Sequence, residues 1–222
     1  MLDVMCSMMY GLPQVVDYDT SLPPLDAGVH PAELVHGCPP ELQLILADIN
    51  TRSAWKQIGP ILDWYTIERR LREWQPCLQT SKGEDSWKLV ARLAVQESWR
   101  HTLLTYLYMA VCGAKSNEAR VETSVRQVFQ IINTVKHEIQ PVTKAHFFLQ
   151  YLIAGAFTPN ERYRALARER LSDGIETKVW LMNMSGFVPV LDHLWHGAAA
   201  NGRPVRWSDY VHSRQAMVPI AV

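Results

Sequence analysis

The chain has 222 residues, of which 48% are hydrophobic and 20% are charged, and its 22 basic and 22 acidic side chains cancel. This composition is typical of soluble globular domains and excludes a disordered tail, a collagen-like chain and a small disulfide scaffold. No apolar run approaches the roughly 18 residues of a membrane span, and the N-terminus lacks the basic region of a signal peptide, so we expect no membrane association.

The charge is unevenly distributed along the chain. The first 51 residues carry seven acidic side chains and no Lys or Arg, whereas the remainder carries all 22 bases and 15 acids. Such asymmetry can mark a nucleic-acid-binding face. Here the bases are spread over many helical segments and form no single patch, so solvated helix faces explain them better.

Residues 1–40 are expected to contain the end of a truncated helix followed by an extended, proline-rich segment. Leu2, Met5, Met8 and Met9 form one helical stripe with no capping residue ahead of it, as in a helix whose start is missing. Six of the 13 prolines then lie in residues 11–40, where each fixes φ and removes a backbone donor.

From residue 41 the spacing of apolar residues becomes that of amphipathic helices. Thr158 is expected to cap one of these helices, with Pro159 at its first position and Glu161 completing a capping box. Pro189 predicts a kink or a break in the last helix. The helices are predicted over residues 41–58, 61–74, 87–113, 118–137, 145–157, 158–174 and 176–200.

The same spacing predicts which side chains are buried. The segment 145–157 is apolar on nearly every side and belongs at the centre of a core. Val90 is expected to face inward with the other apolar residues of the helix over 87–113. The helix over 158–174 is expected to expose four arginines, Arg162, Arg164, Arg168 and Arg170.

The overall pattern predicts an all-α fold. Period-two alternation is absent over any useful length, and no Asn-Gly or Asp-Gly turn separates two strand-like runs. We expect an irregular bundle or array of about six to eight helices with a long proline-rich N-terminal connection. Residues 41–200 would form the helical domain, and residues 201–222 a C-terminal tail.

The cysteines and histidines offer only weak metal-binding candidates. The four cysteines lie more than thirty residues apart, which is typical of reduced thiols. His30, His36 and Cys38 form the best cluster, but no fourth ligand for zinc is evident. His193 and His196 lie three apart without the Glu of an H-E-x-x-H motif. We therefore predict no metal site.

Catalytic motifs are not found in the sequence. The chain contains no G-x-S-x-G elbow and neither of the glycine-rich phosphate-binding patterns, G-x-x-x-x-G-K-[ST] and G-x-G-x-x-G. We therefore predict that the protein is not an enzyme.

Glu97, Arg100 and His101 are the candidate ligand-binding residues. They interrupt the apolar face of the helix over 87–113 and lie one turn apart, so that they can pair. Charged groups in an apolar cavity could bind a small-molecule effector. A buried structural ion pair explains the same residues more simply, because ion-pair networks also occupy such places.

The order of several weak motifs resembles the C-terminal half of the fungal-specific transcription factor domain, the all-helical middle region of fungal zinc-cluster regulators. The similarity runs from about Leu2 to Tyr210 and includes the stretches HGCPPELQLILADIN, ESWRHTLLTYLYMAVCG, FFLQYLIAGAFTPNERYRALARERL and VLDHLWH. Its most telling parts are His36-Gly37-Cys38-Pro39, Trp99-Arg100-His101, Ala154-Gly155 and Leu194-Trp195.

This resemblance implies a nuclear transcription regulator whose helical region acts through an effector, a protein partner or self-association. In such regulators a separate zinc cluster with six closely spaced cysteines contacts DNA. The present sequence has only four cysteines, widely spaced, and so lacks this module. We therefore predict that this chain is a regulatory or interaction domain without a cofactor of its own. DNA would be contacted only by the zinc-cluster module, which this sequence does not contain. A small-molecule-binding helical sensor is the alternative, and an unrecognised all-α enzyme is the third hypothesis.

Overall fold

The structure is a computed structural model that describes residues 2–18, 37–55, 64–76, 86–135, 147–172 and 184–219. These residues form nine α-helices and no β-strand, which confirms the all-α prediction. Most of the proline-rich segment, including His30 and His36, lies outside the described residues.

Helices α3 to α9 follow the predicted ones with ends shifted by a few residues, whereas α10 covers only part of the helix predicted over 176–200 and α11 was not predicted. A π-helical turn, η1 (Leu107–Val111), extends α5, and two 3-10 turns, η2 (Met184–Phe187) and η3 (Ala200–Gly202), flank α10. The α-helices are α1 (Leu2–Tyr10), α3 (Pro40–Trp55), α4 (Trp64–Glu73), α5 (Ser86–Tyr106), α6 (Ala119–Thr134), α8 (Phe148–Phe157), α9 (Glu161–Ser172), α10 (Val188–His196) and α11 (Trp207–Met217).

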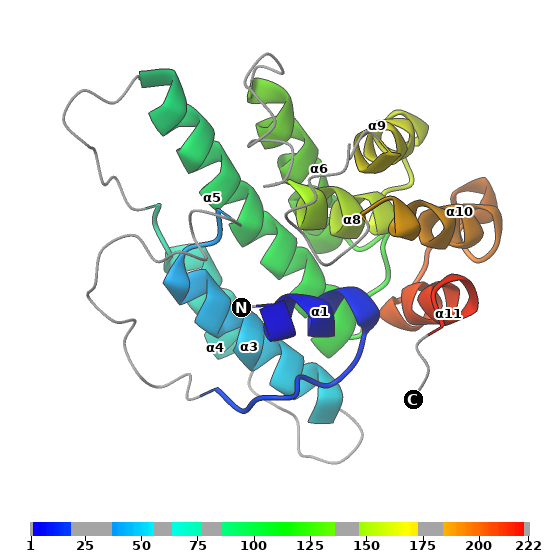
Figure 1. Ribbon diagram of the computed structural model, residues 1–222, viewed down its shortest axis with the longest axis horizontal. Helices are drawn as coiled ribbons and strands as arrows, with labels where there is room; N and C mark the ends of the chain where they lie inside the picture. Colours follow the sequence, from blue (N-terminus) through cyan, green and yellow to red (C-terminus); the bar gives the residue numbers. More distant parts are fainter. Residues whose placement is uncertain are drawn as a thin grey trace.

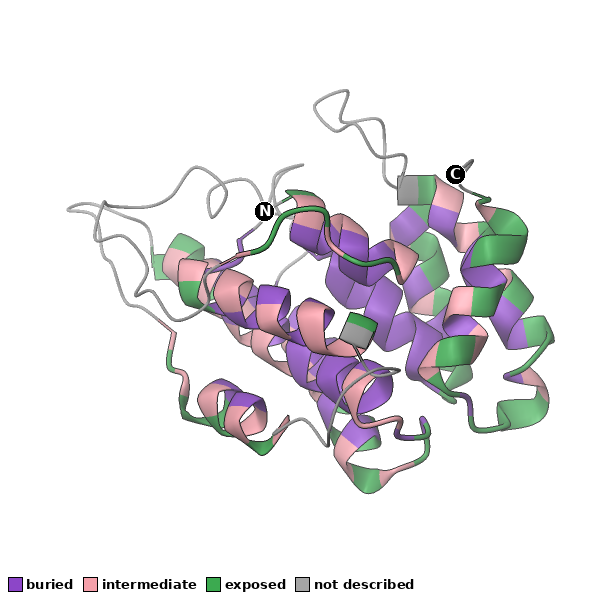
Figure 2. Cartoon of the chain, turned by 90° about the horizontal axis from the view of Figure 1, so that it is seen from below, coloured by how far each residue is buried: buried purple, intermediate pink, exposed green. Residues whose placement is uncertain are grey.

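Helix α5 runs through the middle of the fold, with α3 and α4 on one side and α6 and α8 on the other (Figure 1). All ten residues of α8 are buried, as the lack of a polar face predicts. Buried residues lie on the inner faces of the surrounding helices, and exposed residues lie on the outer faces (Figure 2). The core is therefore one continuous helical interior.

Polar side chains fix α1 within this core. Asn50 Nδ2 donates to the Val4 carbonyl at 2.9 Å, and the Tyr106 hydroxyl donates to Asn50 Oδ1 at 2.8 Å, so α1, α3 and α5 are joined. The Tyr210 hydroxyl donates to the Met9 carbonyl at 2.7 Å and attaches α11 to α1. The residues assigned to a C-terminal tail thus contain a helix that packs on the first one.

The cap of α9 differs from the prediction. Asn160 Oδ1 accepts the backbone N–H groups of Arg162 and Tyr163 at 2.9 and 3.4 Å, and is therefore the N-cap. Thr158 Oγ1 instead accepts the N–H of Asn160 at 3.2 Å. The prediction was wrong by two residues because Pro159 holds Thr158 in extended geometry, with ψ at 132°, and the helix begins only after Asn160.

Two predictions of burial were also wrong. Arg164 is buried, because its Nε donates to the Thr158 carbonyl at 3.0 Å and its Nη2 to the Ala199 carbonyl at 3.3 Å. Val90 is exposed, because it lies in the first turns of α5, where no described helix covers it. Pro189 does break the helical pattern as predicted, since α10 begins at Val188.

Candidate functional site on α4 and α5

The three residues singled out on α5 lie together in the structure. Arg100 Nε donates to Glu97 Oε2 at 2.9 Å, and its Nη2 donates to Glu97 Oε1. His101 Nε2 lies 3.4 Å from the same Oε1. The spacing of three and four residues on one helix produces this contact directly. We call Glu97, Arg100 and His101 the α5 cluster.

The α5 cluster is partly shielded from solvent, with 27% of the Glu97 side chain and 15% of the His101 side chain exposed. Burial disfavours the charged form of Glu97, but hydrogen bonds from His101 and Arg100 outweigh it and hold the glutamate pKa below its ordinary value. His101 Nδ1 is buried and has no hydrogen-bond partner within the described residues. Glu97 is therefore ionised at neutral pH, and one imidazole nitrogen of His101 is unsatisfied.

A second group of charges on α4 lies beside the first. Arg100 Nη1 donates to the backbone carbonyl of Arg72 at 3.4 Å. The Arg72 side chain pairs with Glu68 at 2.8 Å, and the Tyr108 hydroxyl donates to Glu68 Oε1 at 2.6 Å. Burial and the bond to Glu68 raise the pKa of Tyr108 to about 12, so its phenol stays protonated. We call Glu68, Arg72 and Tyr108 the α4 cluster.

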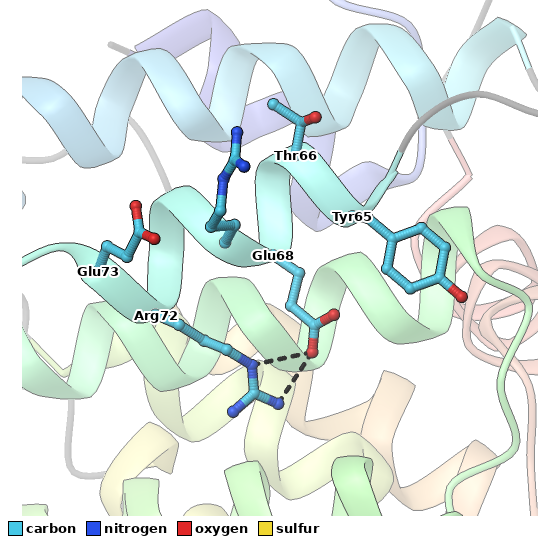
Figure 3. Close-up of a pocket in the computed structure, with 6 residues that line it drawn as sticks. Tyr65, Thr66, Glu68, Arg72 and Glu73 are labelled. Carbon is cyan, nitrogen blue, oxygen red and sulfur yellow. Dashed lines mark hydrogen bonds and ion pairs between the residues drawn. The ribbon is translucent and has the colours of Figure 1, made fainter.

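The α4 cluster borders a surface pocket of about 520 Å³ (Figure 3). In the close-up, Glu68 and Arg72 point toward each other, and the ring of Tyr65 extends to the side of the same helix. Tyr65 is 66% exposed and is available to a ligand. The described lining residues are Tyr65, Thr66, Glu68, Arg69, Arg72 and Glu73.

Sequence reasoning identified the α5 cluster but missed the α4 cluster. The spacing of four between Glu68 and Arg72 is a usable signal for their ion pair. Tyr108 gave no signal, because its orientation depends on the π-helical turn, which helical periodicity does not reveal. Both carboxylates are already bound by an arginine, so the arrangement favours ligand binding or structural pairing over proton transfer.

The structure does not bring the metal-ligand candidates together into a metal site among the described residues. Cys38 is buried, and His30 and His36 lie outside the described residues. His193 Nδ1 lies 3.1 Å from Ser213 Oγ, and His196 Nδ1 lies 2.8 Å from the Asp192 carbonyl. Within the described ranges, no group of three or more His, Cys, Asp or Glu side chains could hold a metal ion.

No helix in the described part of the chain has both the length and the apolar composition to cross a membrane.

The described residues form an all-α domain with paired charges on its α4 and α5 faces. A family model described as the fungal-specific transcription factor domain matches residues 1–220. The chain belongs to this family, and the membership supports a role in transcription regulation. No curated protein and no solved structure matches the chain.

Proposed function

We propose that the chain is a regulatory or interaction domain of a nuclear fungal transcription regulator. The family match over residues 1–220 carries this proposal. The continuous core of α1 to α11 supports it, because a cooperative helical domain can present a fixed surface to a partner or to a second copy.

This domain would not contact DNA by itself. The sequence has four widely spaced cysteines and balanced charge, which differ from the clustered ligands and basic patch of a zinc-cluster DNA-binding module. DNA contact and zinc would belong to such a module in full-length relatives. We also propose no enzymatic role and no resident cofactor.

Tethering tests the regulatory role. The chain is fused to an unrelated DNA-binding domain and a reporter gene is measured in fungal nuclei, beside the Leu152→Asp variant with a broken core. Leu152 is fully buried, so this variant should lose whatever change in reporter output the native fusion causes. The exposed Arg162→Ala variant is the matched control and should keep it. A folded native fusion that leaves the reporter unchanged contradicts the proposal.

Two solution measurements test the molecular interactions. Light scattering over a concentration series, with and without candidate protein partners, should show a rise in mass when the chain associates.

A mobility-shift assay with this chain should show no sequence-specific DNA complex, and tight specific binding would refute the proposed division of roles.

A small-molecule sensor is the second candidate, favoured by one observation. The unpartnered Nδ1 of His101 lies in a charged cluster that shares Arg72 with the edge of the α4 pocket. Concentration-dependent thermal stabilisation by a small polar ligand, lost in Arg72→Met and kept in Arg92→Met, would support it. A library screen in which Arg72→Met and the native chain respond alike would count against it.

A further inference from the structure

Arg214 is a buried charge without a counter-ion. Only 3% of the residue is exposed, and its Nε is fully buried without a hydrogen-bond partner. Within the described part of the chain it forms no ion pair. Its neighbour on α11, Ser213, lies 3.1 Å from His193 and is satisfied, so the missing partner is particular to Arg214.

Such a group is unfavourable unless something compensates it. A buried guanidinium loses its hydration, and a buried charge is normally paired or fully hydrogen-bonded. Arg214 lies in the last turn of α11, where the helix end supplies only a fraction of a negative charge. A full anionic partner is therefore the missing element.

The surroundings of Arg214 bring a second donor close. Burial raises the pKa of Tyr10, and the nearby positive charge of Arg214 partly opposes this. The Tyr10 ring packs on Phe187 with centroids 5.4 Å apart. Tyr210 lies one helical turn before Arg214 on α11 and bonds the carbonyl of Met9, the neighbour of Tyr10, so it holds this part of α11 against the end of α1. We call Tyr10, Phe187, Tyr210 and Arg214 the α1–α11 junction.

We propose that the α1–α11 junction binds a small oxyanion, the carboxylate or phosphate group of a small molecule, through the guanidinium of Arg214 and the hydroxyl of Tyr10. The planar fork of a guanidinium matches two oxygens of either group. The ligand is small, because Arg214 is almost completely buried and Tyr10 is only partly exposed. This site is separate from the α4 and α5 clusters and does not depend on the proposed function.

Thermal unfolding of the full chain tests the proposal with inorganic phosphate and acetate as probes, against sodium chloride at equal ionic strength. We expect both probes to raise the Tm, by about 3 °C at a tenfold excess over the Kd and then in proportion to the logarithm of the probe concentration. Arg214→Met should abolish this response. In chloride alone its Tm should equal or exceed that of the native chain, because an unpaired buried charge has been replaced by an apolar side chain.

Two further variants keep the test decisive if Arg214→Met folds poorly. Tyr10→Phe should weaken phosphate binding about fivefold while keeping the response. Arg162→Met removes an exposed arginine and should change nothing. The proposal is overturned if phosphate and acetate act no more strongly than chloride, or if Arg214→Met keeps the response. A response to a hexaglutamate peptide alone would overturn the small-ligand form and indicate an acidic protein segment.

Discussion

Gly11 shows at the residue scale why the first helix ends where it does. Its φ of +61° is left-handed, and the N–H of Leu12 donates to the Ser7 carbonyl at 3.2 Å, which closes α1. A Cβ at this position would lie 2.6 Å from Val211 Cγ2 on α11. Glycine therefore serves two needs, the turn and the close approach of α11.

Substituting alanine at Gly11 should be more harmful than at Gly202 or Gly186, where a Cβ would have open space. We expect Gly11→Ala to lower the free energy of unfolding by about 2 kcal/mol or more, from strain and overpacking together. Gly202 shares a positive φ but has open space, so Gly202→Ala should cost about 1 kcal/mol. Gly186→Ala, with neither feature, is the control. Equal urea midpoints for the Gly11 and Gly202 variants would contradict the role of Val211.

Glu97 gives a prediction about pH. Its lowered pKa means that its stabilisation is fully present above the ordinary value of 4.5 and is lost as the pH falls through the lowered value. Glu97→Gln should therefore cost about 1 kcal/mol at pH 7, and the difference from the native chain should shrink below about pH 4.5. Urea unfolding across this range measures it. The exposed Glu122→Gln should show a small, nearly constant difference, and a constant gap for Glu97→Gln would disprove the pairing.

At the scale of the helices, α8, α9 and α10 meet at Gly155. A Cβ at Gly155 would lie 2.8 Å from the Cβ of Ala167 on α9, and Trp195 Nε1 on α10 donates to the Gly155 carbonyl at 3.0 Å. Two motifs of the family resemblance, Ala154-Gly155 and Leu194-Trp195, thus form one contact. Their role is to bring three helices together in the core.

A double-mutant cycle tests this close approach. Gly155→Ala should lose about 1 kcal/mol, because overpacking outweighs the gain in helix propensity. In an Ala167→Gly background the facing methyl is absent, so the same substitution should become neutral or stabilising. The coupling energy should be about 1–2 kcal/mol, measured by chemical unfolding. Strictly additive effects would show that the two helices separate freely.

The success of sequence reasoning also varied by element. Helix α8 was predictable because an apolar segment without a polar face fits only a core centre. Helix α11 was not, because its buried face includes Ser213 and Arg214, so apolar periodicity is lost. The α5 cluster follows from local spacing, whereas Arg72 and Tyr108 join it only through contacts between helices. The periodicity of apolar residues does not predict which polar groups from different helices contact each other.

At the scale of the whole molecule, the first and last described helices of the chain, α1 and α11, stabilise each other. Helix α1 packs on α3, and the hydroxyl of the fully buried Tyr210 on α11 bonds the Met9 carbonyl in the last turn of α1. In Figure 1 one end of α1 lies next to α11, although the two helices lie about 200 residues apart in the chain, in agreement with this bond between Tyr210 and Met9. They should therefore open together as one cooperative unit.

Hydrogen exchange tests that coupling. Tyr210→Phe removes one buried hydrogen bond and leaves the Met9 carbonyl unsatisfied, so the amides of α1 and α11 should both exchange about fivefold to tenfold faster. Amides of α8 should keep their rates, because the contact between α8 and residue 210 is that of the Phe157 ring with the Tyr210 ring, and Tyr210→Phe retains this ring. Tyr65→Phe removes an exposed hydroxyl and serves as the matched control. Faster exchange in α11 with α1 unchanged would mean that the two helices open independently, and that the first helix is held by α3 alone.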